Sequence, residues 1–473
     1  MKNVELPNDI EQSMLLVISG RLRGRFGFRF VAPLALGSTL NPINSTMIAT
    51  ALVPIATSFH ASVADAGWLI AGLYLASAIA QPTMGRLADL FGARRIYLIS
   101  LFLVAAAGLL GRLAPSLSSL VVVRVLLGIG TSGAYPSAMR IFRVQADHLG
   151  CEPPRAAMGF LSLAALSTAA IGPLLGGVLT GAFGWHSIFL VNVPLALVTA
   201  LLVLLWTPKD QVRRAGFARV LKELDLGGIG LFAAFLLCLM IFLMNLGRPI
   251  WVALLGAAAL GVALVVHSLR TKQPFIDVRM LASNSPLTLT YLRAGVLLTI
   301  VYCIIYGFAQ WLESAAGFTS SEAGLMMLPI SVVGVLSSLA GARTKGIRAP
   351  ILVSIGSALL GCVCLVFVDH ATPAWIIAVV VMLFGLPQGL FSTATQAAVY
   401  IQAPADAIGT AAGLQRTAGY IGAIAATSLL ALMYGQRATD HGFHSLAVVL
   451  GVLSTFLLVF TIFDRTLPRG PVG

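Results

Sequence analysis

Charged side chains inside long apolar runs are the residues of this sequence whose types could do chemistry. Arg124, Arg293 and Arg416 each lie within such a run, and Glu313 lies just beyond the end of the run that contains Arg293. An Arg at the centre of a bilayer costs at least about 2.5–3.5 kcal/mol on insertion scales, so it normally faces a cavity or a partner. A guanidinium there can bind an anion or an acceptor-rich neutral molecule, and a carboxylate can carry a proton. For Arg124, packing against backbone carbonyls is an equally good interpretation.

Polar side chains recur at helical spacing in the same runs. Residues three or four apart share one side of a helix, and each such residue alone is more often a contact between helices than a ligand contact. Together with two of the arginines they predict the substrate-binding residues, which are Asn41, Asn44, Ser45, Arg293, Tyr302, Tyr306, Gln310, Gln388, Gln396 and Arg416. No Asp or Glu lies deep in an apolar run. We therefore expect a neutral or anionic substrate rather than a lipophilic cation.

The elements that must position these residues are membrane-spanning helices. Hydrophobic residues make up 58% of the 473 residues and charged residues 10%, whereas soluble proteins carry roughly 25% charged residues. This composition excludes a soluble enzyme, a nucleic-acid-binding domain and a disordered chain. At about 20 residues per span, the apolar runs predict an all-α polytopic membrane protein with 14 transmembrane helices, at 30–55, 66–86, 95–112, 119–140, 156–181, 186–206, 226–246, 250–269, 287–311, 322–341, 350–368, 374–395, 407–434 and 445–463.

The spans are arranged six, two, six, and this order predicts the domains. We expect a cytoplasmic tail at 1–29, a six-helix bundle at 30–206, linkers with two extra helices at 207–286, a second six-helix bundle at 287–464, and a cytoplasmic tail at 465–473. With the N-terminus inside, 24 of the 30 Lys and Arg fall on the cytoplasmic side and three fall outside. This asymmetry is typical of helices oriented by positive charge. It predicts a multi-pass cell-membrane protein with both termini in the cytoplasm.

A short charged turn follows the second predicted span and reads GRLADLFGARR from Gly85 to Arg95. Asp89 can cap a helix N-terminus or pair with Arg94 or Arg95, and such pairing could hold one conformation and release in another. The spacing of glycines, acid and bases resembles the signature loop between helices 2 and 3 of the major facilitator superfamily. It departs at Leu90, where the family usually has a basic residue. The gating residues implied by the resemblance are Gly85, Asp89, Gly92, Arg94 and Arg95.

A glycine-rich run in the fifth predicted span reads TAAIGPLLGGVLTGAFGW from Thr168 to Trp185. Pro kinks a helix by removing a backbone hydrogen bond, and Gly lets a neighbouring helix approach closely. The run resembles the antiporter motif of drug-exporting branches of the same superfamily. Arg124 followed by Gly128 and Gly130 resembles its helix 4 motif. The six-two-six layout resembles the fourteen-helix drug:proton antiporter branch. The further gating residues implied are Gly172, Pro173, Gly176 and Gly177.

The resemblance implies the major facilitator fold and a secondary transporter, rather than an enzyme, that exports small organic molecules or drugs by alternating access. Arg124 and Glu313 are the expected coupling residues, because Ser45 stands where the branch often has a carboxylate. The chain has no nucleotide-binding G-x-x-x-x-G-K-[ST] sequence and no metal-ligand cluster. We therefore expect no cofactor and a proton gradient as the energy source.

The expected partners are a small-molecule substrate, protons and the lipid bilayer, without nucleic acid, and we expect the chain to act as a monomer. Two alternatives stay open. One is an uptake symporter or facilitator of the same fold, and the other is a membrane sensor that does not transport.

Overall fold

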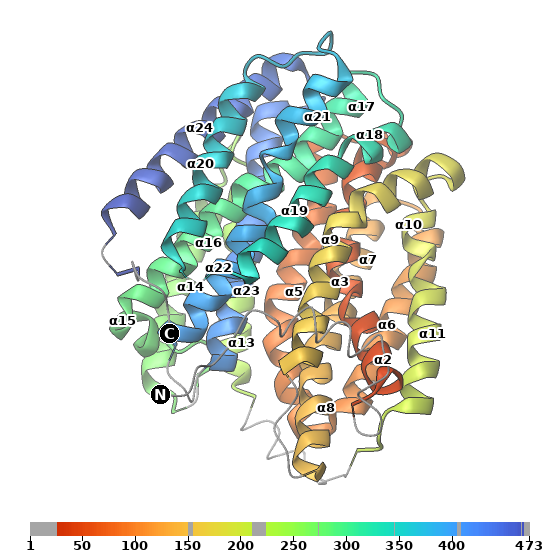
Figure 1. Cartoon of the computed structure of the whole chain (residues 1–473), viewed down its shortest axis with the longest axis vertical. Helices are drawn as coiled ribbons and strands as arrows, with labels where there is room; N and C mark the ends of the chain where they lie inside the picture. The colour runs from red at the N-terminus through yellow and green to blue at the C-terminus, as the bar shows by residue number, and fades with distance from the viewer. Residues whose placement is uncertain are drawn as a thin grey trace.

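The computed structural model consists of helices and their connections in the part of the chain that it describes (Figure 1). The described residues are 26–149, 155–210, 224–272, 274–344, 346–403, 408–464 and 466–467. Most of the expected N-terminal tail, the linker at 211–223 and residues 468–473 lie outside these ranges.

Eleven helices of the described residues are long and apolar enough to cross a membrane. They are Ala93–Leu113, Leu117–Leu149, Ser187–Trp206, Leu226–Met244, Trp251–Arg270, Ser285–Ser314, Ser320–Gly341, Arg348–Leu365, Ala374–Gln402, Ala411–Tyr434 and Asp440–Phe463. Three further helical stretches cover 28–58, Val63–Phe91 and Arg155–Phe183. The chain is a multi-pass, all-helical membrane protein. The count of fourteen spans requires that these three stretches also cross, and it stays a prediction.

The first part of the chain, which we call the N-half, packs as one group of helices. Figure 1 shows it in red to yellow on the right. Its elements are α2 (Phe28–Ser38), α3 (Leu40–Met47), the 3₁₀ turn η1 (Ile48–Ala51), α4 (Leu52–Ser58), α5 (Val63–Phe91), α6 (Ala93–Leu113), α7 (Leu117–Ser132), α8 (Ala134–Leu149), α9 (Arg155–Phe183), α10 (Ser187–Leu190) and α11 (Asn192–Trp206).

A helical hairpin and a second group of helices follow. The hairpin is α13 (Leu226–Met244) with α14 (Trp251–Arg270), and α13 packs on both α5 of the N-half and α23 of the second group. The second group, which we call the C-half, is green to blue in Figure 1. Its elements are α16 (Ser285–Cys303), the π-helix η2 (Ile304–Phe308), α17 (Ala309–Ser314), α18 (Ser320–Met326), α19 (Leu328–Ala342), α20 (Arg348–Leu365), α21 (Ala374–Met382), the π-helix η3 (Pro387–Phe391), α22 (Ser392–Gln402), α23 (Ile408–Tyr434) and α24 (Asp440–Phe463), and the short α15 (Val278–Ser283) precedes it.

The helices run between two ends of the molecule. The near end holds the start of α2, the turn at Gly92 and the last residues of α11, which lie low in Figure 1, and it also holds the last residues of α24. The far end holds the α9–α10 and α17–α18 turns. By the charge pattern of the sequence, the near end is the one predicted to face the cytoplasm.

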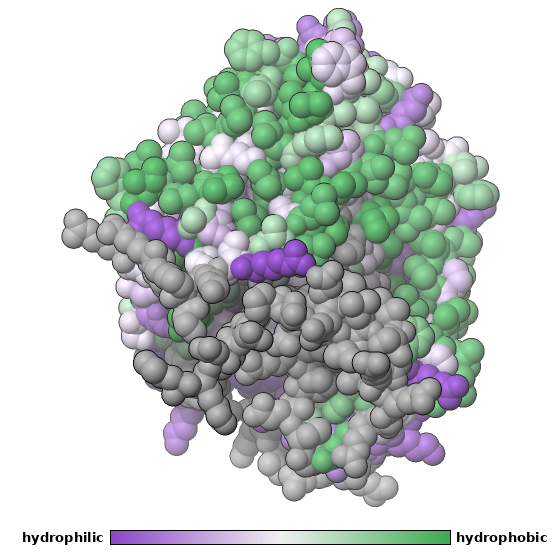
Figure 2. Space-filling view, viewed as in Figure 1, coloured by the Kyte–Doolittle hydropathy of each residue, from purple (hydrophilic) through white to green (hydrophobic). Residues whose placement is uncertain are grey.

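The side chains on the outside of the bundle are mostly apolar. Figure 2 shows hydrophobic residues over most of the upper part of one face. Large apolar side chains are exposed on α6, α11, α14 and α24, for example Phe102, Leu205, Val252 and Phe456. Exposure of this extent suits contact with lipid, since lipid chains are as apolar as the side chains themselves.

The helix around α8 is longer than the sequence predicted. The predicted span ended at Arg140, where charge bounds the apolar run, but the helix continues to Leu149. Charged side chains do not end a helix, because Arg and similar unbranched residues have good helix propensity. Arg140, the last residue of the predicted span, lies in α8, which packs against α5.

Candidate functional site

The two halves touch at the far end through glycines of α9 and α18. A Cβ atom on Gly177 would overlap the carbonyl oxygen of Ser320, and a Cβ on Gly324 would lie 3.1 Å from the Cα of Gly177. The hydroxyl of Ser321 donates to the carbonyl of Gly177 at 3.2 Å. Only helices without side chains at these positions can approach so closely. The far ends of the two halves are therefore closed against each other.

The other glycines of the same run face a different neighbour. Cβ atoms on Gly172 and Gly176 would overlap Thr46 and the carbonyl of Met47, and the hydroxyl of Thr50 donates to the carbonyl of Pro173 at 3.2 Å. These contacts join α9 to the first helical stretch within the N-half. The motif therefore has two faces, one that holds the N-half together and one, at Gly177, that meets the C-half.

A hydrogen-bonded chain of tyrosines crosses between the halves at mid-depth. Tyr306, in the π-helix η2, donates to the carbonyl of Ser45 at 2.7 Å, and its hydroxyl lies 2.8 Å from that of Tyr74 on α5. Tyr302 stacks on Tyr306 at 5.8 Å between ring centroids and lies 5.3 Å from the ring of Tyr74. Short π-helical segments frequently occur at functional sites. Three of the predicted binding residues, Ser45, Tyr302 and Tyr306, are thus brought together across the contact surface between the N-half and the C-half, which we call the seam.

Arg124 reaches the same stretch of backbone from inside the N-half. Its Nη1 donates to the carbonyl of Asn44 at 3.0 Å and its Nε to that of Leu69 at 2.9 Å, while Nη2 is buried without a hydrogen-bond partner. Successive carbonyls of helix α3, those of Asn44 and Ser45, therefore accept from the N-half arginine and from the C-half Tyr306. The arrangement can transmit a movement of one half to the other through the backbone of α3.

One face of α5 meets one face of α23 along the seam. Gly67, Tyr74 and Gln81 are seven residues apart and so lie on one side of α5. The Tyr420 hydroxyl donates to Oε1 of Gln81 at 2.6 Å, and its ring lies 5.5 Å from that of Tyr74. Arg416, one turn nearer the near end, places its guanidinium 4.0 Å from the ring centroid of Tyr135 on α8. The predicted binding residue Arg416 therefore lies at the seam, in a cation–π contact.

Glu313 lies at the far end of the seam, on α17, which packs against α4 and η1 of the N-half and against α18. Its Oε2 accepts from the hydroxyl of Ser320 at 2.9 Å, and its Oε1 is buried without a hydrogen-bond partner. Ser320 is also the residue whose carbonyl lies against Gly177. The carboxyl group is thus joined to the far-end contact between the halves.

The charged turn at the near end is arranged differently from the prediction. Asp89 pairs with Arg140 of the extended α8 at 3.0 Å rather than with Arg94 or Arg95. Both side chains are partly exposed, so the pair can form and break at little cost. Gly85 lies against Pro136 of α8. The prediction of an acid–base pair was right in kind but wrong in partner, because it considered only residues within the turn.

The other half of the turn is held by a residue that the sequence analysis missed. Asp210, just after α11, accepts from the backbone N–H groups of Arg94 at 3.0 Å and Arg95 at 2.9 Å, and so caps the start of α6. A Cβ on Gly92 would overlap this carboxylate, and Gly92 has φ +100°. Both observations explain why only glycine fits there.

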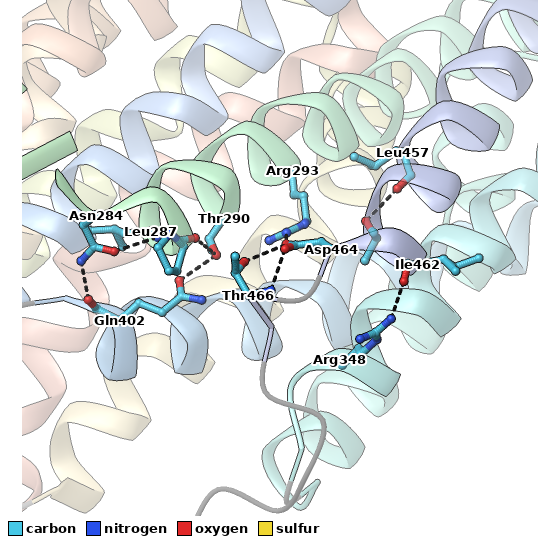
Figure 3. Close-up of polar contacts among 12 residues, drawn as sticks. Asn284, Leu287, Thr290, Arg293, Arg348, Gln402, Leu457, Ile462, Asp464 and Thr466 are labelled. Carbon is cyan, nitrogen blue, oxygen red and sulfur yellow. Dashed lines mark hydrogen bonds and ion pairs between the residues drawn. The ribbon is translucent and has the colours of Figure 1, made fainter. Parts of the chain in front are cut away.

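Arg293 does not lie at the seam, which corrects its assignment as a substrate-binding residue. It is fully buried on α16 and forms an ion pair with Asp464, directly after α24 (Figure 3). Its guanidinium also lies 5.4 Å from the ring centroid of Phe460. This ion pair could not be predicted from helical spacing, because Asp464 follows the last helix and is far from Arg293 in the sequence.

The remaining predicted binding residues make contacts inside one half. Asn41 donates to the hydroxyls of Ser77 at 3.2 Å and Thr131 at 2.9 Å, and Asn44 exchanges amide hydrogen bonds with Asn192 on α11 at 2.6 and 2.9 Å. In the C-half, Gln310 donates to the carbonyl of Tyr306, Gln388 faces Gly334 on α19, and Gln396 is exposed. Gln310 alone of these three is bonded to a seam residue.

Several residues of the seam were missed although the sequence carried a signal for them. Tyr420 lies four residues after Arg416, and Tyr74 lies seven before Gln81, so each pair shares a helix face. Tyr135 and Asp210 carried no such signal, because their partners are on other helices. Among the described residues there is no group of three His, Cys, Asp or Glu that could hold a metal ion.

Comparison with known proteins identifies the family. A family model described as the Major Facilitator Superfamily matches residues 34–427. The chain belongs to this superfamily. It is 34% identical over 430 residues to the uncharacterized MFS-type transporter YwoD of Bacillus subtilis, covering 89% of this chain and 93% of the relative. It is 28% identical over 445 residues to the tetracenomycin C resistance and export protein of Streptomyces glaucescens, covering 89% of this chain and 78% of the relative.

The fold is similar to that of solved superfamily structures. The xylose transporter XylE from E. coli, in a partially occluded inward open conformation, superposes with a TM-score of 0.62 and 13% identity over 94% of this chain and 99% of that chain. This identity shows the fold alone. The chain is therefore a membrane transporter of this superfamily, whose members handle small molecules, and relatives at modest identity are named for drug resistance and export.

Proposed function

We propose that this transporter exports small organic molecules in exchange for protons by alternating access, as a member of the fourteen-helix drug:proton antiporter branch. The observation that carries the proposal is the seam itself. Tyrosines from both halves, Arg416 and Glu313 meet along it, and glycine contacts close it at the far end. A seam that is polar at mid-depth and tightly closed at one end suits a substrate path between two halves that rock against each other.

Glu313 is the proposed proton carrier. An ionised carboxylate away from water needs hydrogen-bond donors or a cation beside it, whereas a protonated one needs fewer partners. Glu313 has one donor, the Ser320 hydroxyl, and one buried oxygen without a partner. Opening of the far end would expose this oxygen to water and allow proton exchange, and closure would bury it again. Arg124 is the proposed second coupling residue, acting through the α3 backbone.

The proposed substrate is neutral or anionic and aromatic or rich in acceptor groups. The seam offers the rings of Tyr74, Tyr302 and Tyr420 for stacking and the partly exposed guanidinium of Arg416 for an anion or acceptor. Arg293 does not support this preference for a neutral or anionic substrate, because its guanidinium forms an ion pair with Asp464. The direction of transport rests on the relative named for export.

The test is transport by the purified protein in liposomes, with and without a pH gradient. The panel contains organic acids, neutral antibiotics and cationic dyes, and the variants are Glu313→Gln and Arg416→Ala, with Arg270→Gln as the matched control because Arg270 is exposed at the end of α14. We expect gradient-driven movement that Glu313→Gln abolishes and Arg416→Ala weakens. Transport of quaternary cations that survives Arg416→Ala but fails in Glu313→Gln would contradict the charge preference. Substrate movement that needs no pH gradient would favour a facilitator. Substrate movement in the same direction as the protons would favour an uptake symporter.

The proposed location is the cell membrane, with the near end and both termini in the cytoplasm and the chain active as a monomer. An impermeant thiol reagent, used on a variant that keeps Cys151 as its single cysteine, tests the orientation. Cys151 lies outside the described residues, between α8 and α9 in the sequence. It should be labelled after lysis and not in intact cells, and labelling in intact cells would reverse the orientation.

A further inference from the structure

Each half carries the same contact at the near end. It joins the third predicted span of the half, which is α6 or α20, to the sixth, which is α11 or α24. In the N-half, Nη2 of Arg94 donates to the carbonyl of Leu204 at 2.7 Å. In the C-half, Nη2 of Arg348 donates to the carbonyl of Ile462 at 2.5 Å. The last four carbonyls of a helix lack partners within the helix and form the negative end of its dipole. A guanidinium therefore suits them better than a neutral donor does.

The two contacts are equivalent in the topology as well as in their chemistry. Arg94 and Arg348 are the second and first residues of α6 and α20, and Leu204 and Ile462 lie in the last turns of α11 and α24. The helices α6 and α11 pack along each other, as do α20 and α24. Transporters of this kind are built from related halves. Recurrence of one contact at corresponding positions argues that it is a feature of both halves and not an accident of packing in one of them.

An aspartate follows each sixth helix in the sequence and bonds to a helix of the same half, which is α6 itself in the N-half and α16 in the C-half. Asp210 accepts from the N–H groups at the start of α6, at 3.0 and 2.9 Å. Asp464 forms the ion pair with Arg293 on α16 and accepts from the N–H of Thr466 at 2.8 Å and its hydroxyl at 2.9 Å (Figure 3). The chain leaving each sixth helix is therefore fastened to its own half, although by different partners.

We propose that Arg94 and Arg348 are equivalent near-end clasps, positioning residues that hold the third and sixth helices of each half together while the halves move against each other. This inference rests on the proposed transport function. Neither arginine lies on the seam described above, so a loss of the clasp changes the rate of reorientation and leaves substrate affinity nearly unchanged. Arg348→Lys keeps a charged donor for the carbonyl, whereas Arg348→Gln removes the charge and shortens the side chain.

The first measurement needs no substrate. Spin labels replace the exposed Val353 on α20 and Phe463 on α24, and dipolar EPR measures the spread of distances between them in the otherwise unchanged chain. We expect one narrow distribution for the parent and for Arg348→Lys, and a broadened one for Arg348→Gln. Labels at Ile99 and Leu205 test Arg94→Gln and Arg94→Lys in the same way. A narrow distribution in both Gln variants overturns the proposal.

The second measurement is transport in liposomes. Arg94→Gln and Arg348→Gln should each lower the maximal rate several-fold with KM within about twofold, their effects should multiply in the double variant because separate sites act independently, and both Lys variants should recover the rate. Unchanged rates, or a change in KM alone, contradict the proposal. If the Gln variants do not fold, a broad EPR distribution in the Lys variants overturns it and a narrow one supports it. A parent that moves no compound refutes the proposed function, while the EPR result still decides on the clasps.

Discussion

The hydroxyl of Tyr306 is the group whose removal should most directly loosen the closed arrangement of the two halves. It donates to the carbonyl of Ser45 in the N-half and accepts from Tyr74, also in the N-half, while Tyr306 itself belongs to the C-half. Tyr306→Phe removes both hydrogen bonds and keeps the ring. Tyr434→Phe is the matched control, because the buried Tyr434 hydroxyl donates to the carbonyl of Gly307 at 3.0 Å within the C-half.

The size of the effect follows from the two bonds and from the hydroxyl left behind. A hydrogen bond between membrane helices is worth about 0.6 kcal/mol on average. Loss of the Tyr306 oxygen also leaves the Tyr74 hydroxyl, which is 1% exposed, without that acceptor, and an unsatisfied buried group costs about 1–3 kcal/mol. The two lost bonds and the unsatisfied hydroxyl together should cost the closed arrangement about 2–4 kcal/mol, which is a factor of about 30–700 in its ratio to the open one.

Dipolar EPR between spin labels at the far end measures this ratio. Leu113 on α6 and Phe367 after α20 are both exposed there, one in each half. In Tyr306→Phe a longer-distance population should grow at the expense of the parent distance. In Tyr434→Phe the distances should match those of the parent. Both variants should lower the unfolding temperature of the purified protein, and Tyr306→Phe should lower it more, because it loses two buried hydrogen bonds and Tyr434→Phe loses one.

Two results would refute this reasoning. Identical distance distributions in the parent and in Tyr306→Phe would show that the tyrosine bonds do not hold the halves closed. A shift of equal size in Tyr434→Phe would show that the distances respond to general loosening of the C-half.

Three further predictions concern the far end, the charged turn and the hairpin. Gly177→Ala should force α9 from α18 at a cost of about 1–3 kcal/mol and lengthen the same EPR distance, whereas Gly356→Ala, whose Cβ would meet no atom within 4 Å, should not. Asp89→Asn and Arg140→Gln should each slow transport by up to about fivefold with unchanged KM, since an exposed ion pair is worth about 0–1 kcal/mol, and unequal effects would argue against their pairing. Burial raises the pKa of Asp225, but hydrogen bonds from His267 and from two backbone N–H groups outweigh it and hold this pKa below its usual range. The carboxylate therefore stabilises the fold above the unfolded pKa of about 3.9 and loses this effect as the pH falls, so Asp225→Asn should lower the melting temperature at pH 7 and match the parent in acid.

The helices could be predicted from the sequence because each one is a local property. An apolar run long enough for a bilayer gives a helix whatever it packs against. The glycine run of α9 could likewise be recognised as a close-packing surface. Its division into a face for α3 and η1 and a face for α18 could not, because the sequence does not say which helices are neighbours.

The partners of charged residues were the least predictable part of the site. Arg293 looked like a cavity residue because the nearest acids in sequence are far from it, and its ion pair with Asp464 requires α16 and α24 to be adjacent. The pairing of Asp89 with Arg140 likewise requires two helices, α5 and α8, to be adjacent. In both cases the residue type was informative, since a buried or conformationally restrained charge needs a partner. The identity of the partner depended on tertiary structure.

Under the proposed proton antiport, the stretch from Asn44 to Thr50 explains how this chain works without a carboxylate in its first helix. Its backbone accepts from Arg124 and Tyr306 at adjacent carbonyls, and its next turn packs beneath the glycines of α9. Backbone carbonyls cannot take up a proton, so this stretch can sense a movement of Tyr306 but cannot itself exchange protons. A titratable group must then act from elsewhere on the same seam. Glu313 follows Tyr306 by seven residues on the continuous η2–α17 segment and is bonded to Ser320 at the far-end closure. In the proposed mechanism, a proton gained or lost at Glu313 acts on the closure directly and on the α3 backbone through Tyr306, so that proton exchange and the response to it occupy separate sites.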